Sequence, residues 1–406
     1  MSGRVSADRV PMVTEIPNRF DIAEDWRHGG FGLYVHWPFC AAKCPYCDFN
    51  SHVTAQVDQG RWASALSSEI ARLGRELPGR VLGSIFFGGG TPSLMAPDTV
   101  DAIISAARAA WGFDNRIEIT LEANPTSVEG GRCRGYAEAG VNRLSMGVQA
   151  LNDEDLRRLG RLHNVAEARA AFDIARDCFE RVSFDLIYAR QDQTPAAWRQ
   201  ELREALSMAV DHLSLYQLSI EPGTAFGARA AAGKLRGLPD DDISADMYLE
   251  TNDICSDFGL ECYEISNHAR PGRESRHNLT YWRQGDWAAV GPGAHGRLTL
   301  AGGRVATQAH RLPGEWIRAV ETSGSGDATR HGIGREDMAT EYLLMSMRLA
   351  EGMDQQRFAR LAGRGPDPQR VADLQELDMI RCSNGRIKAT AKGRPLLNAI
   401  LRELAV

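Results

Sequence analysis

Short runs of aliphatic and β-branched residues alternate with amphipathic stretches between residues 31 and 225. The runs predict six strands, at residues 33–36, 84–87, 117–122, 143–148, 182–187 and 213–218. Strands that alternate with helices indicate parallel β/α units, and six such units suit an open or partial (β/α)6 barrel in the α/β class. Ligands of such folds bind at the carboxyl ends of the strands, so we expect site residues there.

Two of the intervening segments have a clear helical period. The segment after the second strand places Pro97 at its first helical position, and its apolar face consists of Val100, Ile103, Ile104 and Ala107. The segment after the fourth strand is capped by Asn152 or Asp153, and its apolar residues are Leu156, Leu159 and Leu162. Both segments therefore predict crossover helices between parallel strands.

The regular pattern weakens after residue 225. Residues 226–240 are rich in Ala and Gly and predict a loop or short helix, whereas residues 322–336 predict a linker. The last seventy residues predict helices that end in a hairpin at residues 383–386, because Asn-Gly between apolar residues favours a tight turn. Helices followed by a hairpin predict a small, winged-helix-like C-terminal domain.

The composition narrows the class of protein. Hydrophobic residues make up 43% and charged residues 25% of the 406 residues, which is typical of a globular protein. The net charge of −6 gives no support for a nucleic-acid-binding surface. Charged residues interrupt every candidate signal peptide in the first thirty residues, and no apolar run is long enough to span a bilayer. We expect a cytoplasmic protein, with peripheral contact at the inner membrane face left open.

Three of the eight cysteines fall within eight residues. Cys40, Cys44 and Cys47 follow the first predicted strand with the spacing Cys-x3-Cys-x2-Cys. In a reducing compartment such a group predicts a metal site. Three thiolates can hold three corners of a four-iron cluster and leave the fourth iron open to a ligand. The alternative is a structural zinc site with His36 or His52 as the fourth ligand.

Polar residues gather where the predicted strands end. Residues 88–92, Gly-Gly-Gly-Thr-Pro, follow the second strand, and Glu122 ends the third. Gln149 ends the fourth strand, and Asp185 lies within the apolar fifth strand. A carboxylate at an otherwise apolar position is costly unless it has a partner, although a hydrogen bond in the core would also satisfy it. Together these residues predict a ring of ligand-binding groups.

The run from Tyr34 to Phe49, with its cysteine motif, resembles radical S-adenosylmethionine (SAM) enzymes and, among them, the group related to oxygen-independent coproporphyrinogen III oxidase. The resemblance implies one [4Fe–4S] cluster, SAM bound at the open iron, and cleavage of SAM when an electron donor reduces the cluster. It covers nearly the whole chain from residue 31. It also implies SAM contacts from Tyr34, Tyr46, Gly90, Thr91, Glu122, Gln149, Arg161 and Asp185.

Two groups share this resemblance: the oxidase, which decarboxylates propionates of coproporphyrinogen III, and the HemW-type heme chaperones. The oxidase group has a further cysteine two positions after the third cluster cysteine, where this chain has Phe49. Residues 1–30 do not resemble the amino-terminal segment of the oxidase. Residues 277–282, His-Asn-Leu-Thr-Tyr-Trp, match the HNxxYW motif of the chaperones. The resemblance implies that His277 contacts heme, and a buried core histidine is the competing interpretation.

We therefore expect a chaperone that binds a [4Fe–4S] cluster, SAM and heme and delivers heme to heme proteins such as respiratory enzymes. The oxidase is the alternative, and no catalytic residue is assigned. His295, on a Gly-rich turn, is a weaker heme candidate. Client proteins at a membrane surface and a homodimer are left open, and no nucleic-acid partner is expected, because the stretch at residues 373–378 is acidic. The expected divisions are a flexible extension (1–30), the partial radical SAM barrel (31–225), an α/β extension (226–325) and the C-terminal domain (326–406).

Overall fold

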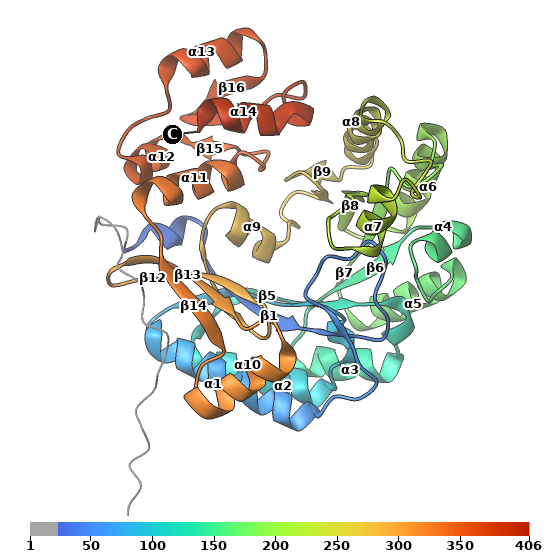
Figure 1. Cartoon of the computed structure of the whole chain (residues 1–406), viewed down its shortest axis with the longest axis vertical. Helices are drawn as coiled ribbons and strands as arrows, with labels where there is room; N and C mark the ends of the chain where they lie inside the picture. The colour runs from blue at the N-terminus through green and yellow to red at the C-terminus, as the bar shows by residue number, and fades with distance from the viewer. Residues whose placement is uncertain (1–22, 406) are drawn as a thin grey trace, which may run out of the picture.

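One large open sheet organises the chain (Figure 1). The computed structural model describes residues 23–405, and within them twelve strands form this sheet in the order β14-β13-β12-β11-β1-β4-β5-β6-β7-β8-β10-β9. Seven adjacent strands are parallel: β11 (Asp286–Val290), β1 (Phe31–Trp37), β4 (Val81–Gly89), β5 (Gly112–Ala123), β6 (Arg143–Gln149), β7 (Arg181–Tyr188) and β8 (His212–Gln217). The predicted partial barrel and all six of its predicted strands are confirmed.

Antiparallel strands extend both edges of the parallel part. They are β12 (His295–Leu300), β13 (Gly303–Ala309) and β14 (Asp327–Gly332) beside β11, and β10 (Asn267–Ala269) and β9 (Glu261–Cys262) beside β8. Strands β14 and β9 end the order without pairing with each other, so the barrel is not closed.

Helices cover the outer face of the sheet. They are α1 (Gln59–Glu76), α2 (Pro97–Ala110), α3 (Gly130–Ala139), α5 (Val165–Cys178), α6 (Pro195–Met208), α8 (Asp241–Asp257) and α10 (Pro313–Ser323). The short helices α4 (Asp153–Arg158) and α7 (Ala225–Ala231) instead share a separate small hydrophobic cluster through Leu156 and Phe226. None of the helices among residues 23–405 is both long enough and apolar enough to cross a membrane.

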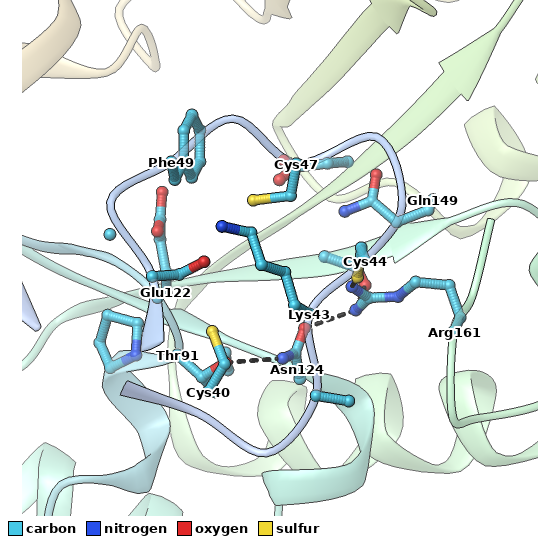
Figure 2. Close-up of a pocket in the computed structure, with 18 of the residues that line it drawn as sticks. Cys40, Lys43, Cys44, Cys47, Phe49, Thr91, Glu122, Asn124, Gln149 and Arg161 are labelled. Atoms are coloured by element: carbon cyan, nitrogen blue, oxygen red, sulfur yellow. Dashed lines mark hydrogen bonds between the residues drawn. The ribbon is translucent and has the colours of Figure 1, made fainter. Parts of the chain in front are cut away.

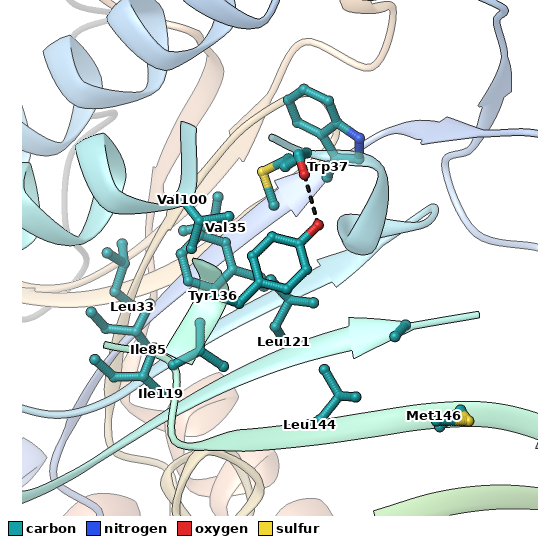
Figure 3. Close-up of a cluster of buried hydrophobic side chains, with 14 of the residues drawn as sticks. Leu33, Val35, Trp37, Ile85, Val100, Ile119, Leu121, Tyr136, Leu144 and Met146 are labelled. Atoms are coloured by element: carbon teal, nitrogen blue, oxygen red, sulfur yellow. Dashed lines mark hydrogen bonds between the residues drawn. The ribbon is translucent and has the colours of Figure 1, made fainter. Parts of the chain in front are cut away.

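The strands alternate between an apolar outer face and a polar inner face. Leu33, Val35 and Leu121 point to the core beneath the helices, where Val100 of α2 meets them (Figure 3). Residues at the intervening positions, such as Asp185 of β7, lie on the inner face. Because side chains of a strand alternate with period two, an apolar outer face leaves every second position free for binding groups.

Helix α9 (Arg276–Trp282) packs on the inner face against β4 and β1. The buried carboxylate of Glu118 on β5 holds its amino-terminal end, because the backbone N–H of Arg276 donates to Glu118 Oε1 at 2.9 Å. A carboxylate at this end also complements the positive end of the helix dipole. The HNxxYW residues are therefore part of the barrel interior.

A separate C-terminal unit has its own hydrophobic core. It contains α11 (Arg335–Ser346), α12 (Gln355–Ala362), α13 (Pro368–Glu376) and α14 (Leu397–Leu404), with a small sheet of β15 (Met353–Asp354), β16 (Ile380–Ser383) and β17 (Arg386–Ala389). The predicted hairpin is confirmed: Ser383 pairs with Arg386, and Asn384 and Gly385 adopt the positive φ angles that its tight turn requires.

Two expectations need correction. The predicted linker is wrong, because α10 extends to Ser323 and Asp327 begins β14, where it pairs with Arg72 at 3.1 Å. Strand β14 therefore belongs to the main sheet and not to the C-terminal unit.

The helix capped by Asn152 is shorter than predicted. Helix α4 ends at Arg158, because Gly160 adopts a left-handed φ of 68° that stops the helix, and Leu162 is consequently 66% exposed. The predicted flexible extension at residues 1–30 lies mostly outside the described residues. Within residues 23–30, which the structure describes, Asp25 of η1 (Asp25–His28) forms an ion pair with Arg357 at 2.7 Å.

Candidate cluster and SAM site

The cysteine loop lies at the carboxyl ends of the central strands. It runs from β2 (Phe39–Cys40) to β3 (His52–Val53), two short strands that pair with each other beside the main sheet. Two contacts fix the loop from opposite sides. The N–H of Phe226 in α7 donates to Pro45 O at 2.8 Å, and Asn50 Nδ2 donates to Pro292 O at 2.9 Å.

A chain of hydrogen bonds connects two of the cluster cysteines (Figure 2). Thr91 Oγ1 donates to Cys40 Sγ at 3.5 Å, and Asn124 Nδ2 donates to Thr91 Oγ1 at 2.9 Å. Arg161 then bonds both Asn124 Oδ1 and Cys44 Sγ, the latter at 3.3 Å. Four segments that are far apart in the sequence therefore position the two thiols together.

One cavity of about 710 Å3, counting the part open to solvent, is bounded by the cysteine loop and the strand ends. The cavity brings together ten of the predicted residues: Cys40, Cys44, Cys47, Tyr46, Gly90, Thr91, Glu122, Gln149, Arg161 and Asp185. The structure thus collects the predicted cluster ligands and seven of the eight predicted SAM contacts in one place.

Tyr34 lies apart from this group. Its side chain lines an adjoining cavity, and its hydroxyl pairs with His36 Nδ1 at 3.0 Å. Glu122 lies between the two cavities and lines both of them. A SAM contact from Tyr34 is therefore the one member of the predicted set that the cluster cavity does not include.

Two carboxyl groups on the inner face, on β5 and on β7, have raised pKa values. Burial and the nearby charge of Asp185 raise the pKa of Glu122 to about 8, although the N–H of Gly89 bonds to it. Burial raises the pKa of Asp185 to about 6, while hydrogen bonds from Ser214 and Ser145 and the charges of Arg143 and Arg161 oppose the rise. Such a pair, facing a cavity and repelling each other, favours an arriving ligand with positive charge or hydroxyl donors.

The backbone at the strand ends is shaped for close approach. A Cβ atom on Gly90 would lie 2.7 Å from Phe39 O, so the glycine loop can cross the β2 strand only without a side chain. Gln149 has a φ of 78°, and a register shift between β6 and β7 follows Gly147. A bulge of this kind re-aims the side chain at the end of a strand, here toward the cavity.

The donor set fits an iron–sulfur cluster. Figure 2 shows the thiols of Cys40, Cys44 and Cys47 spaced around the cavity, and no group of three His, Cys, Asp or Glu side chains among residues 23–405 could hold a single metal ion. Four-iron clusters take one thiolate at each iron, so spaced thiols suit a cluster better than a single zinc ion. Burial raises the pKa of the Cys40 and Cys47 thiols, so binding of cationic iron would displace their protons.

The structure places His277 in the core. It is 1% exposed, its Nδ1 pairs with Ser84 Oγ at 2.8 Å, and its Nε2 pairs with Tyr281 Oη at 3.0 Å. Burial lowers the pKa of His277 to about 3. Both ring nitrogens therefore have protein partners, and His277 is a buried core histidine in this structure. The heme contact of His277 stays a prediction.

The cavity residues that were missed from the sequence include Asn124, Lys43 and Ser145. Asn124 stands two positions after Glu122 in a strand-end motif, which was a usable signal. Ser145 sits on the inner face between Arg143 and Gly147, and the polar alternation of β6 could have identified it. Lys43 lies inside the cysteine motif, and its side chain points among the three thiols in Figure 2.

Comparison with known proteins agrees with this geometry. The Radical SAM superfamily model matches residues 34–205, and the HemN C-terminal domain model matches residues 333–396. Radical S-adenosyl methionine domain-containing protein 1, mitochondrial, of Mus musculus is 40% identical over 80% of this chain and 75% of its own length. Heme chaperone HemW of Escherichia coli K12 is 36% identical over 91% of this chain and 96% of its own length.

A solved structure is similar over the whole fold. Coproporphyrinogen III oxidase (HemN) from Escherichia coli, described as a radical SAM enzyme, aligns with a TM-score of 0.77 at 23% identity and covers 97% of this chain and 96% of that chain. An identity this low shows a shared fold alone.

Proposed function

This chain belongs to the radical SAM superfamily and, within it, to the HemW family, and from that premise we propose that it binds heme and delivers it to other heme proteins. The observation that carries the proposal is the 36% identity to the heme chaperone HemW of Escherichia coli across 91% of this chain. The chain thus matches a named carrier over nearly its whole length.

The cysteine loop supports a carrier over an oxidase. Phe49 occupies the position where the oxidase group has its additional cysteine, and it is 57% exposed beside the cluster cavity. A phenylalanine offers no thiol for proton or hydrogen transfer, whereas its exposed ring offers a flat apolar face. The oxidase remains the second candidate, because the shared fold and the complete cysteine motif support it.

In this proposal Cys40, Cys44 and Cys47 hold the [4Fe–4S] cluster, and the strand-end residues hold SAM. A reduced cluster with SAM supplies one-electron chemistry. The chain's own contribution is positional. Arg161 and Thr91 donate to cluster thiols, and the Glu122–Asp185 pair faces the cavity with carboxyl groups that can accept from hydroxyl donors.

The proposal extends to the proteins with which this chain would interact. We propose that heme passes to client heme proteins at a membrane surface from a cytoplasmic chaperone, and that an external electron donor serves the cluster.

The test uses the full chain with its cluster reconstituted anaerobically. One sample receives ferric heme, and its Soret band is followed. A second receives coproporphyrinogen III, SAM and a reductant, and its products are separated. Heme binding without decarboxylated product is the expected result. Decarboxylation of coproporphyrinogen III would establish the oxidase, and absence of heme binding would refute the carrier.

A further inference from the structure

A second cavity adjoins the cluster cavity and contains Tyr34, the one predicted SAM contact that the cluster cavity lacks. The two share Phe49, Gly89 and Glu122, and the second extends from there to the β12–β13 edge of the sheet. It opens to solvent and encloses about 1280 Å3, counting the open part. The space inside that a ligand can occupy is about 650 Å3, within the roughly 300–1,000 Å3 of small-molecule sites. It therefore has room for a large, flat ligand beside the cluster.

The wall nearest the barrel is aromatic. Tyr281 and Trp287 pack edge to face with ring centroids 4.6 Å apart, and Tyr34 continues the wall toward Glu122. Trp287 is held in place because its indole N–H donates to His295 O at 2.9 Å. Phe49 faces this wall from the cysteine loop. Rigid aromatic side chains around a cavity favour a planar, apolar ligand.

The opposite end of the cavity carries polar side chains, two of which have no hydrogen-bond or ion-pair partner among the described residues. His295 begins β12 and pairs in register with Gln308 of β13, so both stand at the cavity edge beside Arg311. The His295 ring makes no hydrogen bond, and the Arg311 guanidinium makes no ion pair, within the described part of the chain. Exposed groups without partners at one end of a cavity, opposite an aromatic wall, are suited to fix the orientation of a ligand.

The other histidine of this cavity is already engaged. His36 pairs through Nδ1 with the Tyr34 hydroxyl at 3.0 Å and through Nε2 with Asn50 O at 2.9 Å. His295, by contrast, keeps both ring nitrogens free, and partial burial with the charges of Arg297 and Arg311 lowers its pKa. The neutral imidazole that results at pH 7 is the form that binds heme iron.

We propose that the heme carried by this protein binds in this second cavity, with His295 as an axial iron ligand, Phe49 against the macrocycle and Arg311 paired with a propionate carboxylate. The inference rests on the proposed function, because it takes heme as the cargo. Arginine pairs well with carboxylates, and the aromatic wall supplies the apolar contact that a porphyrin requires. The cargo then lies next to the cluster cavity instead of at the HNxxYW helix.

The test titrates the full-length, cluster-loaded protein with ferric heme and, in parallel, with metal-free protoporphyrin IX. His295→Ala is expected to weaken heme binding by about tenfold or more and to shift the Soret band, because the iron loses a ligand. It should leave the affinity for metal-free porphyrin within about twofold of wild type. Added imidazole should restore the wild-type Soret band, which distinguishes a lost ligand from a misfolded variant. His331→Ala, an exposed histidine of β14, is the matched control.

Arg311→Gln should weaken heme and metal-free porphyrin equally, since both carry propionates. If wild type binds heme and His295→Ala binds it with the same affinity and spectrum, this site is wrong and the proposed function stands. If His295→Ala weakens the binding of heme and of metal-free porphyrin equally, the side chain only contacts the porphyrin, and its role as an iron ligand is refuted. If wild type binds no heme, the proposed function fails, and this inference fails with it.

Discussion

Arg161 donates a hydrogen bond to the Sγ atom of Cys44 at 3.3 Å, and through Asn124 it is connected to the threonine that bonds Cys40. We predict that Arg161→Gln loses its cluster iron to a chelator about tenfold faster than wild type, because a hydrogen bond to a charged group contributes about 1.5–3 kcal/mol. Iron per chain, measured over time after anaerobic reconstitution, gives the rate.

Arg157→Gln is the matched control for this experiment, because Arg157 is an exposed residue of the neighbouring helix α4 and does not line the cavity. The control should retain iron as wild type does. Equal retention in Arg161→Gln would mean that the contact with Cys44 does not stabilise the cluster.

Glu122 gives the protein a pH-dependent stability. Its pKa rises from 4.5 to about 8 on folding, so between these values the folded chain binds more protons than the unfolded chain. Stability from this residue is therefore lost as the pH rises through that window. We predict that Glu122→Gln gains about 1–2 kcal/mol over wild type between about pH 5 and pH 8, a value reduced by water in the cavity.

Urea unfolding of the cluster-free chain at several pH values measures this difference. Glu138→Gln, an exposed residue of α3, should show the same pH dependence as wild type. A stability difference between Glu122→Gln and wild type that stays constant from pH 5 to pH 8 would show that Glu122 ionises in the folded state as it does in the unfolded chain.

Replacing Gln149 by glycine is expected to raise the stability of the chain and to weaken its binding of SAM. Its φ of 78° is unfavourable for any residue with a Cβ atom, so Gln149→Gly should stabilise the chain by up to about 1 kcal/mol. The same change removes the side chain from the cluster cavity and should weaken SAM binding. Calorimetry with SAM and thermal unfolding test the two effects separately. A variant that is less stable than wild type, or that binds SAM equally well, would contradict the respective half of the prediction.

The parallel strands could be predicted because their outward-facing residues, such as Leu33 and Val35, form short apolar runs between helical segments. Strand β11 escaped prediction for a physical reason. It begins with Asp286, which is fully buried and pairs with Arg80 at 3.2 Å, and two alanines follow Trp287. A charged residue and two alanines, which are weak strand formers, do not give the pattern of a strand. The sequence also does not reveal that Arg80, which pairs with Asp286, lies beside it.

Some residues of the candidate site could be predicted from the sequence, and others could not. Residues inside short motifs, such as Cys44 and Thr91, were predictable from spacing and resemblance. The function of Asn124 was not, because it connects Thr91 to Arg161 only after three segments have folded together. The hydrogen bonds of His277 could not be predicted for the same reason: its partner Ser84 lies on β4, and a motif does not reveal that both ring nitrogens have partners.

Alanine variants of His277 and His295 should differ in what they lose: the first should lose stability, and the second should lose heme affinity. His277→Ala removes a buried ring and leaves Ser84 and Tyr281 without their partner, so we predict a loss of about 2–4 kcal/mol in the free energy of unfolding. Heme affinity, corrected for the folded fraction, should stay within about twofold of wild type. His295→Ala should behave in the opposite way, because an exposed ring without hydrogen bonds contributes little to folding. Urea unfolding and heme titration on both variants measure the two quantities. A His277→Ala protein that is as stable as wild type but binds no heme would instead mean that the HNxxYW helix opens to present its histidine to the iron.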